Sequence, residues 1–382
     1  MLRYFTAGET HGKCLTVIIE GVPAGFRISL DEINEQLSRR QKGYGRGGRM
    51  LIEKDKAEIL SGVRGGISLG SPIAMRIENR DWENWSAIMG TESSNGEKSV
   101  EFPRPGHADL SGGMKYDHHD LRNVLERASA RETAARVAVG ALARQIVEPF
   151  GVEFLSRVVS IGDVTDTADT SAPDFYDRAA ASPVGFGDDA AAKSAMEYID
   201  DIKARGESCG GVVETTVRGL PAGLGSYVHY DRKLDARLAF AVMSIQAIKG
   251  VEIGIGFEAA RRPGSEAHDE IAYKDGSFFR LTNNAGGIEG GMTNGEPVIV
   301  RAAMKPIPTL YNPLRTVSIK DKTEHKASVE RSDACAVPAC AVVVEAAAAF
   351  EIAKAFTEKF GGDCRADIEA AYNAYTERIK NY

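Results

Sequence analysis

The chain has 382 residues, 43% of them hydrophobic, and its 47 basic and 54 acidic side chains give a net charge of −7. This balance is typical of a folded protein with a sizeable core and argues against a general nucleic-acid binder. We expect neither a signal peptide nor a membrane span, because the N-terminus has no basic and apolar leader and the most apolar stretch, residues 334–350, contains Pro338 and Glu345.

The cysteines and glycines narrow the class of protein further. The five cysteines form no CxxC pair, so we expect neither a disulfide framework nor a zinc site, and a reducing cytoplasm suits them. The 40 glycines exceed the ~27 that average usage predicts, and they cluster in a few short segments. Such clusters predict loops in which the backbone takes a positive φ or approaches a ligand closely.

In chain order, the first half predicts short strands around one helix, followed by a longer helical region. A capping box of Ser29 and Glu32 opens a helix that should end near Gln41. Short apolar runs predict strands at residues 15–20, 56–63, 72–78 and 154–162. A glycine-poor apolar pattern predicts helical structure over residues 120–149.

An acidic segment opens the second half. Residues 160–201 hold ten acids and two bases, so we interpret about 163–201 as a solvated insertion, with a helix at about 190–205. The chain beyond it predicts strands at residues 211–218, 251–257 and 297–303 and helices at 232–248, 337–360 and 366–380.

Two stretches of the later chain repeat earlier ones in the same order. Residues 219–223 read GLPAG where residues 21–25 read GVPAG, and GGMTNGEPVIVR at 290–301 follows the pattern of GGISLGSPIAMR at 65–76. We interpret this as two related β-α-β-β halves, about 1–80 and 210–303, stacked around helices. The alternative is a chance recurrence of turn chemistry, because glycine and proline are common turn residues.

A basic, glycine-rich loop is the strongest single indication of a ligand. Its five cations within eleven residues are Arg39, Arg40, Lys42, Arg46 and Arg49. Arginine forks match phosphate and carboxylate oxygens, and glycines let the backbone approach, so a polyanionic small molecule is expected. The alternatives are a solvated surface loop and an RGG-like RNA contact; the absence of further repeats argues against RNA.

Five further segments combine polar side chains with rigid or small residues. His11 and His107 each lie on a turn that suits proton transfer, although either could be an incidental loop histidine. Arg127 and Arg131, at helical spacing i,i+4, could grip one anion or belong to a surface helix. Lys305-Pro-Ile-Pro-Thr309 suits a pocket wall, and Arg331-Ser-Asp333 is either an anion site at a helix N-terminus or an ordinary cap.

Several familiar motifs are absent from the sequence. It contains no GxxxxGK[ST] loop, no Rossmann GxGxxG, no HExxH and no GxSxG, which argues against P-loop enzymes, zincins and α/β-hydrolases. His118 and His119 lack acidic partners at ligand spacing, so we expect no metal site.

Taken together and in order, from residue 3 to about 355, these motifs closely resemble the chorismate synthase family. The stretches that carry the resemblance are AGETHG (7–12), RRQKGYGRGGRM (39–50), ILSGVRGGISLGSPI (59–73), FPRPGHAD (102–109), RASARETAARVAVGA (127–141), SIQAIKGVEIG (244–254), NNAGGIEGGMTNGEP (283–297), KPIPT (305–309) and ERSDAC (330–335). Residues 160–201 are the least family-like part.

The resemblance implies an enzyme that converts 5-enolpyruvylshikimate 3-phosphate to chorismate and phosphate, the last step of the shikimate pathway. The reaction is a 1,4-anti elimination that requires reduced FMN without net redox change. The resemblance also implies a single α+β domain over residues 1–382, with helices sandwiched between antiparallel sheets, and a cytoplasmic homotetramer.

The resemblance assigns roles to residues at matching motif positions. His11 would donate a proton to the departing phosphate, His107 would protonate the reduced flavin near N1, and Asp333 would work with flavin N5 in removing the C6 proton. The residues implied to clamp the substrate's carboxylates and phosphate are Arg40, Arg46, Arg49, Arg104 and Arg131. The stretches implied to contact FMN contain Arg127, Ala128, Ser129, Gln246, Ala247, Gly290, Lys305, Pro306, Ile307, Pro308, Thr309 and Arg331.

Two departures from the family pattern bear on these roles. Thr10 stands where the family usually has serine, which keeps a hydroxyl. Ala128 stands where a second serine is more common, so this side chain cannot donate a hydrogen bond to the flavin.

Alternatives to a plain lyase remain. One is a bifunctional form that reduces its own flavin with NADPH, which the family associates with Arg40 and Arg46. The chain lacks a long insertion, so we favour a monofunctional enzyme with an external flavin reductase as partner. The other is an inactive flavin- or RNA-binding relative, against which the retained His11, His107 and Asp333 argue.

Overall fold

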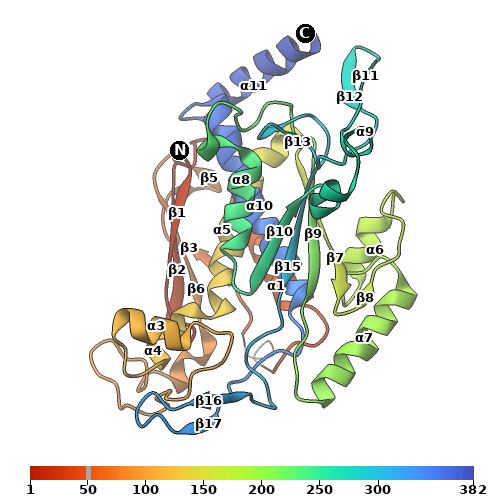
Figure 1. The fold of residues 1–382 in the computed structure, drawn as a ribbon. Coiled ribbons are helices and arrows are strands. Elements are labelled where there is room, and N and C mark those ends of the chain that lie inside the picture. Colours follow the sequence, from red (N-terminus) through yellow and green to blue (C-terminus); the bar gives the residue numbers. More distant parts are fainter. Residues whose placement is uncertain (49–52) are drawn as a thin grey trace.

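Two antiparallel sheets enclose a layer of helices in the structure, a computed structural model that describes residues 1–48 and 53–382 (Figure 1). The four strands of the first sheet are, in spatial order, β1 (Arg3–Ala7), β2 (Cys14–Glu20), β6 (Ile73–Glu78) and β3 (Ala57–Ile59). The five strands of the second are β10 (Ile248–Ile253), β15 (Val298–Met304), β9 (Gly211–Arg218), β7 (Glu153–Ile161) and β8 (Val164–Thr165). The predicted α+β sandwich is confirmed at this level.

The helix layer is built on α5 (Thr133–Val147) and α10 (Val337–Phe360), flanked by α1 (Leu30–Gln41) and α8 (Leu234–Met243). Both long helices are rich in alanine and valine, and most of their residues are buried. At their crossing, a Cβ on Gly140 would lie 2.4 Å from the Ala346 carbonyl oxygen, so only glycine allows this approach of the two backbones.

Local sequence signals account for most element boundaries. The Ser29 hydroxyl accepts from Glu32 N at 3.3 Å, which confirms the predicted cap, and α1 ends at Gln41 as expected. The helix at 337–360 is also confirmed. By contrast, the helix predicted at 232–248 is shorter and the strand predicted at 251–257 begins earlier. Helix α8 ends at Met243 and β10 begins at Ile248, because Ala247 takes a positive φ of 70° between them.

The predicted helix at 120–149 is broken into α4 (Arg122–Ala128) and α5. Ser129 is extended at the break, and its hydroxyl accepts from Arg131 N at 3.2 Å to start a short turn before α5. The expectation that Arg127 and Arg131 share one helical face is therefore wrong, since the two residues lie on opposite sides of the break.

The acidic segment packs on the outside of the second sheet through α6 (Phe175–Ala181) and α7 (Asp189–Ala204) (Figure 1). Phe175 and Phe186 are 0% and 1% exposed, so the segment buries apolar side chains that its acidic average concealed. The predicted helix at 190–205 is confirmed, whereas full solvation of the segment is not.

The remaining elements are short, apart from α11 (Arg365–Lys380) at the C-terminus. They are α3 (Asp109–Tyr116), α9 (Gly264–Ala267), and the hairpins β4–β5 (Val63–Arg64, Ile67–Ser68), β11–β12 (Ile271–Lys274, Ser277–Arg280), β13–β14 (Ile288–Glu289, Met292–Thr293) and β16–β17 (Arg315–Val317, Glu324–Lys326). Across residues 1–48 and 53–382, the structure contains no helix long and apolar enough to cross a membrane.

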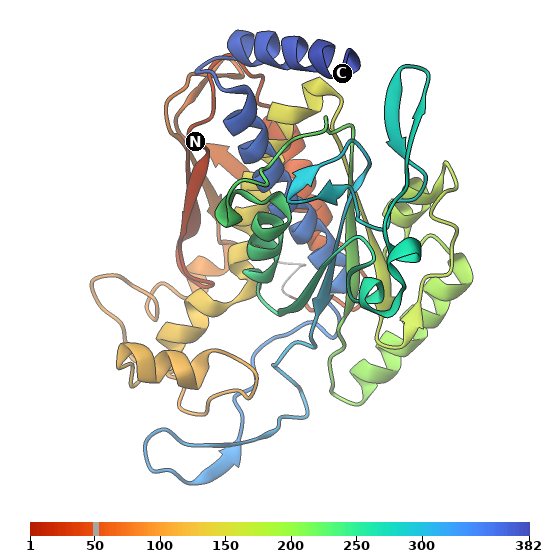
Figure 2. The same cartoon turned by 45° about the horizontal axis from the view of Figure 1, so that its top comes forward.

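The helices α5 and α10 begin at the same end of the sandwich, where α3, α4 and the β16–β17 hairpin also lie (Figures 1 and 2). Helix N-termini carry partial positive charge and unpaired N–H groups, so this end of the fold favours anions.

Candidate active site

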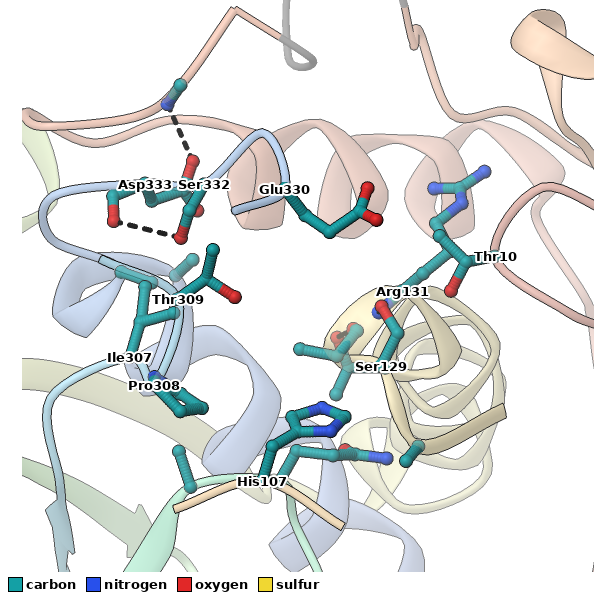
Figure 3. Close-up of a pocket in the computed structure, with 18 of the residues that line it drawn as sticks. Thr10, His107, Ser129, Arg131, Ile307, Pro308, Thr309, Glu330, Ser332 and Asp333 are labelled. Carbon is teal, nitrogen blue, oxygen red and sulfur yellow. Dashed lines mark hydrogen bonds between the residues drawn. The ribbon is translucent and has the colours of Figure 1, made fainter. Parts of the chain in front are cut away.

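A cavity of about 390 Å³ lies at these helix N-termini and is lined by residues from distant parts of the chain. Sixteen of the side chains and turns predicted from sequence line it: His11, Arg40, Arg46, Arg104, His107, Ala128, Ser129, Arg131, Gln246, Ala247, Lys305, Ile307, Pro308, Thr309, Arg331 and Asp333. In Figure 3, His107, Ser129 and Arg131 face Pro308, Thr309 and Asp333 across the cavity. The fold therefore brings nearly all the predicted segments to one place.

His11 is held by Glu126, a residue of α4. Its backbone N–H donates to Glu126 Oε2 and its Nδ1 contacts Glu126 Oε1, both at 2.8 Å. The imidazole also stacks on Trp85, with ring centroids 3.7 Å apart and planes at 15°. His11 is only 6% exposed, so the ring has one orientation, set from two sides.

His107 has a comparable carboxylate partner. Its Nδ1 lies 2.6 Å from Asp109 Oδ1, and Asp109 is completely buried. Arg104 donates through Nε to the other oxygen of Asp109 at 2.8 Å and through Nη1 to Thr309 Oγ1 at 2.9 Å. Burial alone would raise the pKa of Asp109, but its hydrogen bonds from His107 and Arg104 lower it strongly. Asp109 is therefore ionised and accepts the Nδ1 proton of His107.

Arg40 and Arg131 are bridged by one buried carboxylate. Asp55 Oδ2 accepts from Arg40 Nη2 at 2.8 Å, and Asp55 Oδ1 accepts from Arg131 Nη1 at 2.6 Å. Arg131 Nε also donates to Asn79 Oδ1 at 2.9 Å. The two guanidinium groups are thus fixed side by side at the cavity wall, where they can meet a polyanion without rearranging.

Asp333 lies on the segment before α10. Its Oδ1 accepts from Gly47 N at 2.6 Å, and its Oδ2 lies 3.2 Å from Arg46 Nη1. These contacts tie the segment that follows β17 to the basic loop after α1. The predicted roles of the basic loop and of Asp333 thus fall on groups in direct contact.

Another part of the cavity lining combines rigid and strained backbone. Lys305 N donates to the carbonyl of Ala247 at 3.0 Å, and Lys305 Nζ donates to the carbonyl of Gly106. Ala247 takes a left-handed φ of 70°, which is costly for a residue with a Cβ and is common at ligand sites. Next to it, Gln246 Oε1 is buried and has no hydrogen-bond partner among the residues that the structure describes.

Four predicted residues are not placed at this cavity. Arg49 lies outside the described residues. Within the part of the chain that the structure describes, Arg127, Pro306 and Gly290 do not line the cavity. Arg127 donates instead to the carbonyls of Thr6 and Gly8, at 3.0 and 3.2 Å, and Gly290 lies in the turn of the β13–β14 hairpin.

The sequence analysis did not predict which residues contact the two histidines. Asp109 follows His107 by two residues, and that spacing on a turn could have indicated the pair. Glu126 and Trp85 are far from His11 in sequence, and nothing in their own surroundings marks them. Glu330, which also lines the cavity, is tied to Arg122 at 2.8 Å.

Three buried carboxylates around the cavity make the stability of the folded protein depend on pH. Burial alone would raise the pKa values of Asp55, Asp109 and Glu126, but their arginine and histidine partners lower all three. A carboxyl group whose pKa is lower in the folded than in the unfolded state stabilises the fold at pH values above its unfolded-state pKa. This stabilisation is lost as the pH falls toward the folded-state pKa.

We therefore expect the free energy of unfolding to fall as the pH drops below about 4, the ordinary carboxyl range. Urea unfolding between pH 7 and pH 3 measures it. Unchanged or rising stability on acidification would show that these carboxylates are not held ionised in the folded state.

Comparison with known proteins gives matches over the whole length. A family model described as "Chorismate synthase" matches residues 2–357. Chorismate synthases of Pelobacter propionicus (56% identity over 391 residues) and Geobacter metallireducens (56% over 394 residues) align over 100% of this chain and of their own. A crystal structure of a chorismate synthase superposes with a TM-score of 0.81 at 45% identity, covering 100% of this chain and 99% of that one.

Proposed function

The chain belongs to the chorismate synthase family, and from that membership we propose that it converts 5-enolpyruvylshikimate 3-phosphate to chorismate and phosphate. The proposed reaction is a 1,4-anti elimination that uses reduced FMN without net redox change. The observation that carries the proposal is the cavity itself, in which two histidine–carboxylate pairs and a cluster of arginines surround one space.

Charge at the cavity fits a substrate with two carboxylates and a phosphate. The lining residues include six cationic side chains and two carboxylates. We propose that Arg40, Arg46, Arg104 and Arg131 bind these anionic groups, together with Arg49. Because each of the four lies against a carboxylate or a hydroxyl group, the donors are oriented before the substrate arrives.

Proton transfer is proposed to involve three groups. An ionised carboxylate can only accept, so Asp109 keeps the Nδ1 proton on His107, and Nε2 is the atom of His107 that gains or loses a proton. We assign His11 Nε2 as the donor to the departing phosphate and His107 as a proton donor toward the cofactor. Asp333, oriented by Gly47 and Arg46, takes part in removal of the C6 proton.

The cavity also fits FMN. Gln246 Oε1 is a buried acceptor that needs a donor such as a ring N–H, and its left-handed neighbour Ala247 turns backbone toward the same space. The residues proposed to hold FMN are Ala128, Ser129, Gln246, Ala247, Lys305, Ile307, Pro308, Thr309 and Arg331. The chemistry that FMN supplies when reduced and bound is an electron-rich ring that assists loss of the phosphate.

The source of reduced FMN is proposed to be an external flavin reductase. The two relatives named above and this chain align with each other over their full lengths. A bifunctional enzyme would use NADPH, at Arg40 and Arg46, to reduce its own flavin. An aerobic assay with NADPH and FMN but no added reductase separates the two: sustained turnover would establish the bifunctional form.

The proposed homotetramer is supported by a bare sheet face. Phe5 and Ile18 lie opposite each other on β1 and β2 and are 68% and 47% exposed. On the second sheet, the corresponding face is covered by α6, where the Tyr176 hydroxyl donates to buried Thr216. Around Phe5 and Ile18, two arginines pair with two glutamates, so a second copy can meet this face without net repulsion.

We expect Phe5→Glu to shift the assembly to smaller species, because the new charge would be buried unpaired in the contact. Light scattering after size-exclusion chromatography measures the mass. The matched control is Tyr382→Glu at the exposed C-terminus. An unchanged mass for Phe5→Glu would remove this face from the interface.

We further propose that the two sheets arose by internal duplication. Spatial order β1-β2-β6-β3 in the first sheet is matched by β7-β9-β15-β10 in the second, with α1 and α8 at equivalent points. The repeated turns also share hydrogen bonds. Ser68 Oγ accepts from Phe26 N at 3.0 Å, and Thr293 Oγ1 accepts from Leu224 N at 2.8 Å. On this basis the second half begins with β7, before the acidic segment.

The proposed activity is tested by an anaerobic assay in which 5-enolpyruvylshikimate 3-phosphate is mixed with the protein and dithionite-reduced FMN. Release of phosphate that depends on both the protein and reduced FMN is expected. Release that is independent of FMN would indicate a phosphatase instead.

A further inference from the structure

The surroundings of His11 contain two residues that the proposed mechanism does not use. We infer that Glu126 and Trp85 are positioning residues that fix both the orientation of the His11 ring and the nitrogen that carries its proton. The inference rests on the proposed role of His11 as proton donor, and its test includes a measurement that does not require the enzyme to be active.

Glu126 grips the His11 turn through both its side chain and its backbone. Besides the two bonds from His11 to the carboxylate, Thr10 donates to the Glu126 carbonyl through its backbone N–H at 3.0 Å and its hydroxyl at 2.8 Å. Four hydrogen bonds therefore join two residues of this turn to a single residue of α4. Thr10, which replaces the usual serine, keeps the hydroxyl that this arrangement uses.

The carboxylate determines the tautomer of His11. Burial alone would raise the pKa of Glu126, but hydrogen bonds from His11 and the charge of Arg122 lower it, so the group is ionised at neutral pH. An ionised carboxylate has no proton to give, so the nitrogen facing it, Nδ1, must be the donor. Nε2 is then the atom that takes up a second proton, and the imidazolium so formed can pass that proton to a bound anion.

Trp85 restricts the His11 imidazole by stacking on one of its faces. The indole lies parallel to the imidazole at 3.7 Å, and Lys98 Nζ lies 3.9 Å from the indole centroid. One face cannot hold both groups at these distances, so Lys98 covers the opposite face. Trp85 Nε1 donates to Asp81 Oδ2 at 3.2 Å, and Trp85 is only 4% exposed. The indole is therefore a fixed platform rather than a mobile side chain.

The same two supports connect His11 to the segment that carries Asp333. Arg122 lies between Glu126 and Glu330, with Nη1 and Nη2 at 3.2 and 2.8 Å from their carboxylates. Asp81, which accepts from Trp85, also accepts from Arg331 Nη2 at 2.8 Å. Both groups that fix His11 are thus tied to residues 330–331, two to three positions before Asp333.

These contacts matter because a proton donor must present one particular atom. A ring turned by 180° would place Nδ1 at the leaving group, and a ring whose Nδ1–H no longer faces Glu126 would lose the carboxylate that balances the charge of the protonated, donating form. Orientation and tautomer errors of this kind cost as much as removing the acid itself, about 10²- to 10⁴-fold in rate.

The first test is made on the wild-type protein without substrate. Nitrogen-15 NMR of the imidazoles, with His11 assigned by its loss in His11→Asn, distinguishes protonated from unprotonated ring nitrogens. We expect protonated Nδ1 and unprotonated Nε2 in the neutral ring of His11. A neutral ring with its proton on Nε2 would overturn the inference, whatever the enzyme's activity.

The second test uses Glu126→Gln. An amide has one acceptor oxygen, so it cannot accept from His11 N, His11 Nδ1 and Arg122 together, and the Nδ1–H tautomer is no longer enforced. We expect the Nε2–H form to appear in the spectrum and kcat to fall by about 10²- to 10⁴-fold. KM is expected to stay within about threefold, because Glu126 is not among the proposed substrate-binding residues.

The matched control is Glu345→Gln. Glu345 is a buried carboxylate that pairs with Arg39 and Arg144 and does not touch a histidine. We expect this variant to lose stability while the His11 spectrum stays wild type. If Glu126→Gln does not fold, Trp85→Leu replaces it: the Nδ1–H tautomer is expected to persist while kcat falls at unchanged KM.

The outcomes separate the two proposals. A wild-type protein that makes no chorismate but shows the Nδ1–H tautomer of His11 would contradict the proposed function and support the positioning by Glu126. A Glu126→Gln variant that turns over at the wild-type rate would overturn the positioning role while leaving the activity intact.

Discussion

Replacing His107 with alanine is expected to lower kcat by about 10²- to 10⁴-fold, the range that a positioned acid or base contributes. The fold should survive, because Asp109 keeps three hydrogen bonds from Arg104 after the imidazole is removed. KM for the substrate should change little if His107 serves proton transfer rather than binding. Steady-state kinetics with reduced FMN under anaerobic conditions, beside thermal unfolding of both proteins, measures these effects.

The chain offers a matched control for this prediction. His229 contacts Asp231 at 2.8 Å with the same two-residue spacing, but the pair is exposed and does not line the cavity. His229→Ala should therefore keep the wild-type rate. A His107→Ala enzyme with the wild-type rate would show that His107 has no part in the reaction.

Asp55→Asn is expected to destabilise the protein by about 3–5 kcal/mol, the cost of breaking a buried ion pair from one side. The Asp55 side chain is fully buried between Arg40 and Arg131, so its loss leaves Arg40 without its carboxylate and Arg131 with only Glu53, 3.8 Å away in the described structure. Chemical denaturation at pH 7 measures the change. We also expect added phosphate to raise the melting temperature of the variant more than that of the wild type, because an anion can restore the missing charge.

Asp169→Asn is the control, since Asp169 is an exposed carboxylate bonded only to nearby Ser171 in the described structure. The free energy of unfolding of this variant should lie within about 0.5 kcal/mol of the wild-type value. Equal stability of Asp55→Asn and the wild type would mean that the two arginines are not held by Asp55.

The sequence predicts best where a residue's role depends on its immediate neighbours. The cap of Ser29 on α1 and the turn that presents His107 are determined by neighbouring residues in the sequence, and both are present in the structure. The helix α10 can also be predicted from its apolar run, because the alanines and valines suit a helix buried on all sides. These local signals also gave the segments that line the cavity.

What the sequence does not reveal depends on tertiary contact. Glu126 becomes the partner of His11 only because α4 packs beside the β1–β2 turn, and Asp55 joins Arg40 to Arg131 from a separate loop. The break at Ser129 was missed because a side-chain hydrogen bond competed with a strongly helical pattern. Acidic composition likewise concealed the buried Phe175.

The proposed reaction at this cavity is a redox-neutral elimination. It is tested most directly by counting chorismate and phosphate formed per reduced FMN in a sealed anaerobic reaction with limiting flavin. Equal amounts of chorismate and phosphate, formed over many turnovers for each FMN that stays reduced, are the predicted result. Oxidation of one FMN per product, or phosphate without chorismate, would contradict it.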